Sequence, residues 1–272
     1  MLKEVFRYIL GFVLFLIIII SFYYSKMILF GVSLFFIIIA MIEYRNMFKH
    51  KNIYPHKFLP ELTGAICAYI FIFSKMSAEQ IIIMPLIILG VILSFSITVI
   101  LNKKPYLETS LSSIAAFLII ICGLYIIKMT YYFQENTSVF LILIYLSAVL
   151  AGDFTASKIG PLYKKIKLAP EISPNKTVLG AVAHVISICI ICCLFSLFMN
   201  IYVWQCILLG IIISVFSQLG DLTVSTFKRD MGIKHSGGFF YNYGGILDRM
   251  DAFIFSAPLA YYFLYYVVSI NG

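Results

Sequence analysis

The stretch IYVWQCILLGIIISVFSQLGD (201–221) shows the pattern that dominates this chain. It has no charged residue from 201 to 220 and then reaches Gly220-Asp221. A helix needs about 20 predominantly apolar residues to cross the hydrocarbon core of a bilayer. The stretch therefore predicts a transmembrane helix that ends with a carboxylate at one membrane surface.

Apolar runs of similar length recur along the chain and predict about nine transmembrane helices. The expected spans are 8–24, 27–42, 58–74, 80–101, 111–128, 138–154, 178–198, 201–220 and 250–269. Of all residues, 62% are hydrophobic and 12% are charged, whereas soluble domains have about 45–50% apolar and about 25% charged residues. This composition excludes a soluble globule, a disulfide scaffold and a nucleic-acid-binding domain. We expect an all-α, polytopic integral membrane protein.

The positions of Lys and Arg predict the orientation. When alternate loops are assigned to opposite sides, all 20 basic residues except Lys26, Lys75 and Lys128 lie on the side of the N-terminus. Basic loops mark the cytoplasmic face. The N-terminus is therefore expected in the cytoplasm, and the protein in a bacterial-type cytoplasmic (inner) membrane.

Polar residues concentrate in two expected cytoplasmic loops, 152–178 and 221–249, which begin at the pairs Gly152-Asp153 and Gly220-Asp221. We therefore divide the chain into N-terminal membrane helices (1–137) and a C-terminal catalytic region (138–272). An ionisable group at membrane depth costs about 2.5–3.5 kcal/mol on insertion scales, so it is a functional candidate by default. A helix end exposed to water at the headgroups is the alternative for either aspartate alone.

The second loop combines acidic, basic and glycine residues. Oxygen ligands suit a hard divalent metal, cations suit an anionic substrate such as a phosphate, and glycine lets the backbone approach it closely. The loop therefore predicts metal-assisted phosphoryl chemistry, with a solvated charged loop as the alternative. The residues are Asp221, Asp248 and Asp251, with Lys228, Arg229, Lys234 and Arg249, and the pair Gly244-Gly245.

The first loop contains a second candidate site for phosphate. Ser173 begins a Ser-Pro turn that is expected to deliver Lys176 and Thr177 to a helix N-terminus, where anions bind favourably. The glycines of a Walker A loop are missing.

These residues resemble the signature of the phosphatidate cytidylyltransferase family. STFKRDMGIKHSGGFFYNYGGILDRMD (225–251) matches its Ser, Lys-Arg, Lys, Gly-Gly and Asp-Arg-x-Asp positions without a gap. KLAPEISPNKTVLGA (167–181) and Gly220-Asp221-Leu222 are similar to two further family elements. The sequence departs from the family at His235, where Asp is usual, and at Tyr243, where His is usual.

The resemblance implies a reaction of CTP with phosphatidic acid that gives CDP-diacylglycerol and pyrophosphate. It implies Asp221 and Asp248 as ligands of Mg²⁺, with two ions, and Asp251 as a weaker ligand. Lys228 and Arg229 are then catalytic. The expected substrate-binding residues are Ser173, Lys176, Thr177, Ser225, Lys234, Gly244, Gly245 and Arg249. A homodimer is expected from family analogy alone, and membrane lipids are the other partners.

Two other functions remain open from the residues. A CTP-dependent kinase of a polyprenol or another lipid alcohol would transfer the γ-phosphate and release CDP. A secondary transporter would use the carboxylates for ion coupling, although transporters place charge near the bilayer midplane and contain repeated halves. Here the charges lie at helix ends, and no convincing internal repeat is visible.

Overall fold

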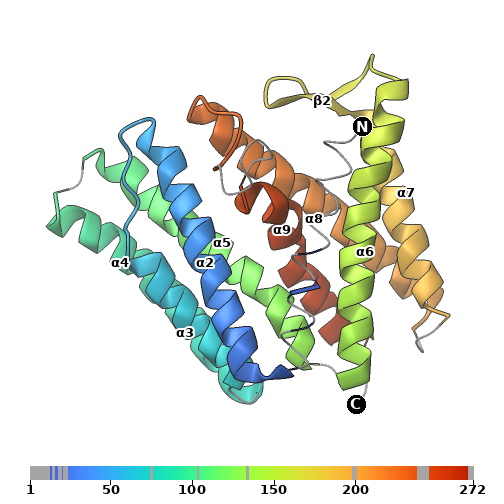
Figure 1. The fold of residues 1–272 in the computed structure, drawn as a ribbon, viewed down its shortest axis with the longest axis horizontal. Helices are drawn as coiled ribbons and strands as arrows, with labels where there is room; N and C mark the ends of the chain where they lie inside the picture. The colour runs from blue at the N-terminus through green and yellow to red at the C-terminus, as the bar shows by residue number, and fades with distance from the viewer. Residues whose placement is uncertain are drawn as a thin grey trace. The chain divides into compact units, whose positions relative to one another are not determined.

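The computed structural model describes residues 13, 16–17, 20, 24–73, 76–102, 104–132, 135–197, 201–237 and 245–268 (Figure 1). Most of them are helical. The α-helices are α2 (Lys26–Lys49), α3 (Leu59–Phe73), α4 (Met76–Ile100), α5 (Tyr106–Tyr132), α6 (Glu135–Ile159), α7 (Val178–Phe195), α8 (Val203–Asp230) and α9 (Leu247–Phe263). The other elements are η1 (Gly160–Leu162), β1 (Lys167–Ala169), β2 (Ser173–Thr177) and the π-helical turn η3 (Leu264–Val268).

The chain divides into two compact units. The first contains residues 1–128 and 230–250, and the second contains 129–229 and 251–272. In the first unit α2 packs against α3, and α3 against α4. Glycines let α5 approach its neighbours closely, because a Cβ at Gly64 would lie 2.5 Å from Ile120 and one at Gly90 would lie 2.7 Å from Phe117. The buried Tyr44 hydroxyl of α2 donates to the carbonyl oxygen of Ser112 at 3.0 Å.

In the second unit α6 and α7 lie side by side (Figure 1). Strands β1 and β2 form an antiparallel hairpin between these two helices, with Lys167 opposite Thr177 and Ala169 opposite Ser173. Helix α8 approaches α7 at Gly210, where a Cβ would lie 2.8 Å from the Cα of Cys189. The hairpin places the Ser-Pro-x-Lys-Thr sequence directly before α7.

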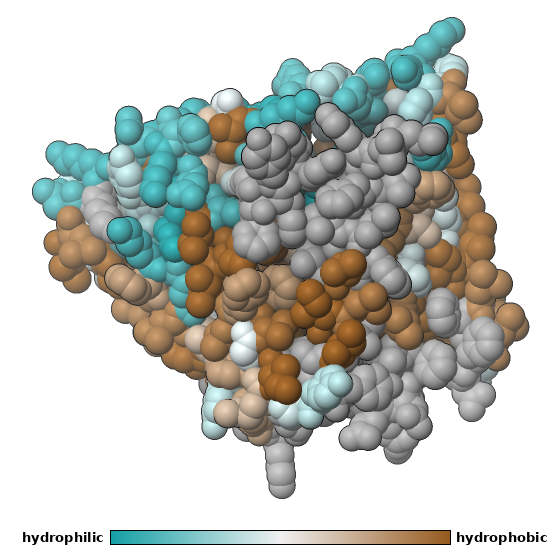
Figure 2. All heavy atoms as spheres, viewed as in Figure 1, coloured by the Kyte–Doolittle hydropathy of each residue, from teal (hydrophilic) through white to brown (hydrophobic). Residues whose placement is uncertain are grey.

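The helices confirm an all-α membrane protein. Within the described residues, four helical segments are long and apolar enough to cross a bilayer: Phe30–Lys49, Tyr106–Met129, Leu141–Leu162 and Val203–Asp230. Shorter apolar helices are Leu59–Phe73, Pro85–Ile100 and Val178–Leu194. Figure 2 shows hydrophobic surface along the helices of the first unit and hydrophilic surface around the connection from α2 to α3. The expected span 8–24 lies largely outside the described residues, and the number nine and the cytoplasmic N-terminus stay predictions.

Two features differ from the sequence prediction. Helices α6 and α8 continue beyond their expected ends at 154 and 220, to Ile159 and Asp230. Hydropathy detects the part of a helix that can cross lipid, whereas the backbone hydrogen bonds that define the helix continue where its side chains become polar. Asp221 and the residues up to Asp230 therefore lie on a helix and not in a loop, and the loop 152–178 contains an unpredicted β-hairpin.

Candidate active site

In the second unit, residues from two separate sequence motifs meet. Lys176 is the last but one residue of β2, and its Nζ lies 2.7 Å from Oδ2 of Asp221 on α8. The hydroxyl of Ser225, one helical turn further along α8, donates to the other carboxylate oxygen at 3.3 Å. The Lys176 and Asp221 side chains are 26% and 30% exposed, so both the cation and the anion are accessible to a solute. Three predicted site residues are thus together.

The hairpin is fixed by hydrogen bonds at its base. Thr177 is the N-cap of α7: its hydroxyl accepts from the backbone N–H of Gly180 at 3.1 Å and donates to the carbonyl oxygen of Gly160 at 3.0 Å. At the turn of the hairpin, Nε of Arg229 on α8 donates to the carbonyl oxygen of Ile172 at 3.0 Å. Ser173 pairs with Ala169 in the hairpin. These contacts set the position from which Lys176 reaches Asp221.

Lys228 and Asp251 are buried in the second unit, at 8% and 6% exposure. Asp251 lies where α9 approaches α8, because a Cβ at Gly220 would lie 2.5 Å from the Asp251 carbonyl oxygen. Its Oδ1 accepts from the backbone N–H of Ala252 at 2.9 Å. Asp251 is therefore buried where two helices pack closely, and its task as a metal ligand stays a prediction.

The first unit contains the rest of the predicted site. Asp248, in the first turn of α9, is 7% exposed, and its Oδ2 accepts from the backbone N–H groups of Ser236 at 2.9 Å and of Gly245 at 3.2 Å. Its carboxylate therefore joins Ser236 and Gly245, which lie at the two ends of the segment 236–245, here called the signature loop. His235 Nδ1 lies 3.9 Å from the same oxygen. Lys234 is exposed, Arg249 is half-buried on α9, and Gly244 and Tyr243 lie outside the described residues.

Comparisons with known proteins identify the family. The model of the cytidylyltransferase family matches residues 5–267. The chain belongs to this family. A phosphatidate cytidylyltransferase of Bacillus subtilis is 32% identical over 235 residues, which are 83% of this chain and 84% of that protein. One of Staphylococcus haemolyticus is 42% identical over 133 residues, which are 48% of this chain and 51% of that protein, so that match spans about half the length of each.

Cytidylyltransferases are nucleotidyl-transferring enzymes that generally use a divalent metal. Among the residues that the structure describes, no three His, Cys, Asp or Glu side chains gather into a metal site. The donor chemistry nevertheless fits a hard cation, because all predicted ligands supply carboxylate oxygens. The Asp221 carboxylate already has the ammonium of Lys176 beside it, so its surroundings accept a positive charge.

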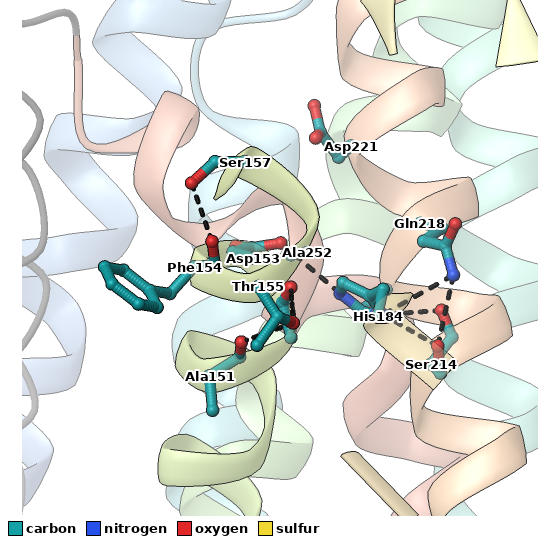
Figure 3. Close-up of polar contacts among 12 residues, drawn as sticks. Ala151, Asp153, Phe154, Thr155, Ser157, His184, Ser214, Gln218, Asp221 and Ala252 are labelled. Atoms are coloured by element: carbon teal, nitrogen blue, oxygen red, sulfur yellow. Dashed lines mark hydrogen bonds and ion pairs between the residues drawn. The ribbon is translucent and has the colours of Figure 1, made fainter. Parts of the chain in front are cut away.

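The sequence did not predict a further polar cluster, which lies among α6, α7 and α8 (Figure 3). His184 on α7 is 2% exposed, and its Nδ1 lies 2.7 Å from the hydroxyl of Ser214 on α8. Its Nε2 lies 3.4 Å from Oδ1 of Asp153 on α6, an ion-pair distance without hydrogen-bond geometry. The amide of Gln218 donates to Ser214 at 3.1 Å. A lone histidine in an apolar run gives no sequence signal, and only the packing of three helices reveals its partners.

Proposed function

We propose that this protein transfers the cytidylyl group of CTP to phosphatidic acid and so makes CDP-diacylglycerol and pyrophosphate for phospholipid biosynthesis. The family match over most of the chain supports the proposal, as does the similarity to the phosphatidate cytidylyltransferase of Bacillus subtilis. The observation that carries it is the contact of Lys176 with Asp221, because it joins a basic phosphate-binding motif to an acidic motif in one accessible place.

The proposed reaction brings two polyanions together. A phosphate oxygen of the lipid attacks the α-phosphorus of CTP, a new P–O bond forms, and pyrophosphate leaves with the electrons of the broken P–O bond. The lipid phosphate is already ionised near neutral pH, so no general base is required. Catalysis of this kind consists mainly of positioning and charge stabilisation.

Asp221 and Asp248 are proposed to hold two Mg²⁺ ions, with Asp251 as a weaker or indirect ligand. When bound, Mg²⁺ would neutralise charge on the reacting and leaving phosphates. The cationic side chains orient the triphosphate and the lipid phosphate, and glycine permits close backbone approach. This group comprises Lys176, Lys228, Arg229, Lys234 and Arg249 with Ser173, Ser225, Gly244 and Gly245. Thr177 supports Lys176 by capping α7.

An isotope experiment tests the reaction. The purified protein in detergent is incubated with Mg²⁺, a panel of lipid acceptors and CTP labelled at either the α- or the γ-phosphate. We expect the α-label to enter lipid only with phosphatidic acid, and the γ-label to leave as pyrophosphate. Transfer of the γ-label to a lipid alcohol would establish the kinase alternative, and no transfer to any acceptor would overturn the proposal.

We further propose that the site faces the cytoplasm, that the chain crosses the inner membrane nine times and that it forms a homodimer. CTP is cytosolic, which agrees with the distribution of basic residues. The exposed Glu171 at the hairpin turn provides a test. A Glu171→Cys variant in intact spheroplasts should resist an impermeant maleimide that labels it after permeabilisation. Labelling before permeabilisation would reverse the orientation. Mass measurement of the detergent complex tests the dimer.

A further inference from the structure

A carboxylate in the N-terminal half, Glu43, lies within the first unit and outside every motif described above. It is on α2, directly after the expected apolar span 27–42 and close to the buried residues Met41, Tyr44 and Met47, and it is itself only 5% exposed. A charged group inside a membrane helix is costly and is kept where it has a task. The contacts of Glu43 show what this task is.

The Glu43 carboxylate caps the helix that carries Asp248. Its Oε2 accepts from the backbone N–H of Leu247 at 3.0 Å, although 204 positions separate the two residues. Leu247 is the first residue of α9, where backbone N–H groups have no partner inside the helix and where negative charge is favourable. The next residue is Asp248. Glu43 therefore holds the turn from which the Asp248 carboxylate projects.

The same carboxylate lies against both described ends of the signature loop. A Cβ added to Gly237 would lie 2.7 Å from Cδ of Glu43, and one added to Gly245 would overlap its carboxylate oxygens. Gly237 has no positive φ, so a side chain there would be opposed not by the backbone angle but by this close approach, and the Glu43 carboxylate would have to shift to make room for it. Asp248 joins the same ends through its bonds to Ser236 and Gly245.

We propose that Glu43 is the positioning residue of the signature loop. It caps α9, fills the space between Gly237 and Gly245, and so fixes the direction of the Asp248 carboxylate. The inference rests on the proposed function, because the task of Asp248 in the reaction is part of that proposal. A residue from a helix outside the signature thus completes the loop.

Kinetics of Glu43→Ala, with Glu43→Gln as the conservative variant, test this assignment. Removing a group that orients a metal ligand typically costs about 10–100-fold in metal affinity or activity. We expect Glu43→Ala to lower kcat about tenfold or more and to raise the Mg²⁺ concentration for half-maximal activity severalfold. Glu43→Gln retains an acceptor for the Leu247 N–H and should recover most of kcat.

Tyr44→Phe is the matched control, because it removes a buried hydrogen bond from the neighbouring position of the same helix. It should lower the thermal stability and leave the Mg²⁺ requirement unchanged. If Tyr44→Phe changed the Mg²⁺ requirement as much as Glu43→Ala, or if Glu43→Ala left kcat and that requirement at wild-type values, the positioning assignment would be overturned.

A double-mutant cycle provides a second test. Gly237→Ala places a methyl group against the Glu43 carboxylate and should lower kcat. Glu43→Ala removes the group that it meets, so the double variant should lose less than the product of the two single losses. Strictly multiplicative losses would contradict the contact.

Hydrogen exchange of the peptide 245–250 separates this inference from the proposed function. Glu43→Ala should accelerate exchange at the Leu247 amide whether or not the protein makes CDP-diacylglycerol. If the wild-type protein shows no cytidylyl transfer and Glu43→Ala exchanges faster, the proposed function is refuted and the capping assignment stands. Unchanged exchange in an active protein would refute the cap alone.

Discussion

Asp221 and Asp248 have the same predicted task, yet their surroundings differ. The Asp221 side chain is 30% exposed and bonded to two side chains, Lys176 and Ser225. Asp248 is 7% exposed and accepts from two backbone N–H groups. Side-chain partners can turn towards a substrate, whereas backbone partners are fixed by the fold. We infer that Asp221 exchanges partners when reactants bind and that Asp248 also serves as a structural support.

The largest effect is expected from Asp248→Asn. The asparagine oxygen can still accept from Ser236 and Gly245, so the loop should keep its fold while the charge is lost. We expect the rate of CDP-diacylglycerol formation to fall by more than about a hundredfold. Losses of this size are observed when one preorganised group that stabilises charge in the transition state is removed from an enzyme. Thermal unfolding should change little.

Asp248→Ala completes that experiment. It removes the acceptor as well and leaves two buried N–H groups unsatisfied, at a cost of about 1–3 kcal/mol each. It should therefore unfold at a lower temperature than Asp248→Asn. An active Asp248→Asn enzyme would refute the metal-ligand assignment, and equal stability of the two variants would refute the structural one.

Lys176→Met tests whether the Asp221 pair is exchangeable. A partly exposed ion pair contributes at most about 1 kcal/mol, so the folded state should tolerate the change. If Lys176 leaves Asp221 to bind phosphate, the KM for CTP should rise about tenfold, which corresponds to about 1.4 kcal/mol of lost binding. Lys165→Met, at an exposed lysine between η1 and β1, is the matched control for surface charge. A loss of stability without a change in KM would mean that the pair is structural only.

Much of the fold follows from composition. Apolar runs predict the helices from 27–42 onwards, because a helix that crosses lipid must be long and hydrophobic, and both properties can be read directly from the sequence. The hairpin of β1 and β2 was not predicted, because strands of three and five residues give almost no periodic signal. The start of a helix directly after Thr177 was predicted correctly, but the expected Ser-Pro turn was wrong, because Ser173 and Pro174 lie in strand β2. The capping role of the Thr177 hydroxyl was not predicted.

Site residues could be predicted where they belong to a motif with several polar residues close together in the sequence. They could not be predicted where they are brought together only by the packing of helices. Lys176 and Asp221 were both candidates, although the sequence contained no sign that they pair. His184 was missed because it is a single polar residue in an apolar run, and Glu43 because it is one of several polar residues that follow the span 27–42. The partners of both residues lie on other elements of the fold. Such residues become visible only when helices distant in sequence are placed together.

His184→Leu extends the comparison to the other Gly-Asp pair. Asp153, like Asp221, directly follows a glycine, but the partner of its carboxylate is a buried histidine instead of an accessible lysine. The leucine would leave buried groups such as the Ser214 hydroxyl with fewer partners, which costs about 1–3 kcal/mol. We expect lower thermal stability and an unchanged KM for CTP. A large rise in KM would assign Asp153 and His184 to the substrate site.

The smallest effect concerns Thr177, which was predicted to bind phosphate. A hydroxyl has one proton to donate, and that of Thr177 goes to the carbonyl oxygen of Gly160, while one lone pair accepts from Gly180. Phosphate requires a donor, so this hydroxyl suits the cap better than an anion. Thr177→Val keeps the shape and removes the cap, at a cost of about 1 kcal/mol, whereas Thr177→Ser should retain it. The unfolding temperature and the KM for CTP, measured on both variants, separate capping from phosphate binding. If Thr177→Val loses stability with only a small change in KM, the hydroxyl acts as a cap that supports Lys176. A large rise in KM at unchanged stability would instead show that Thr177 binds phosphate directly.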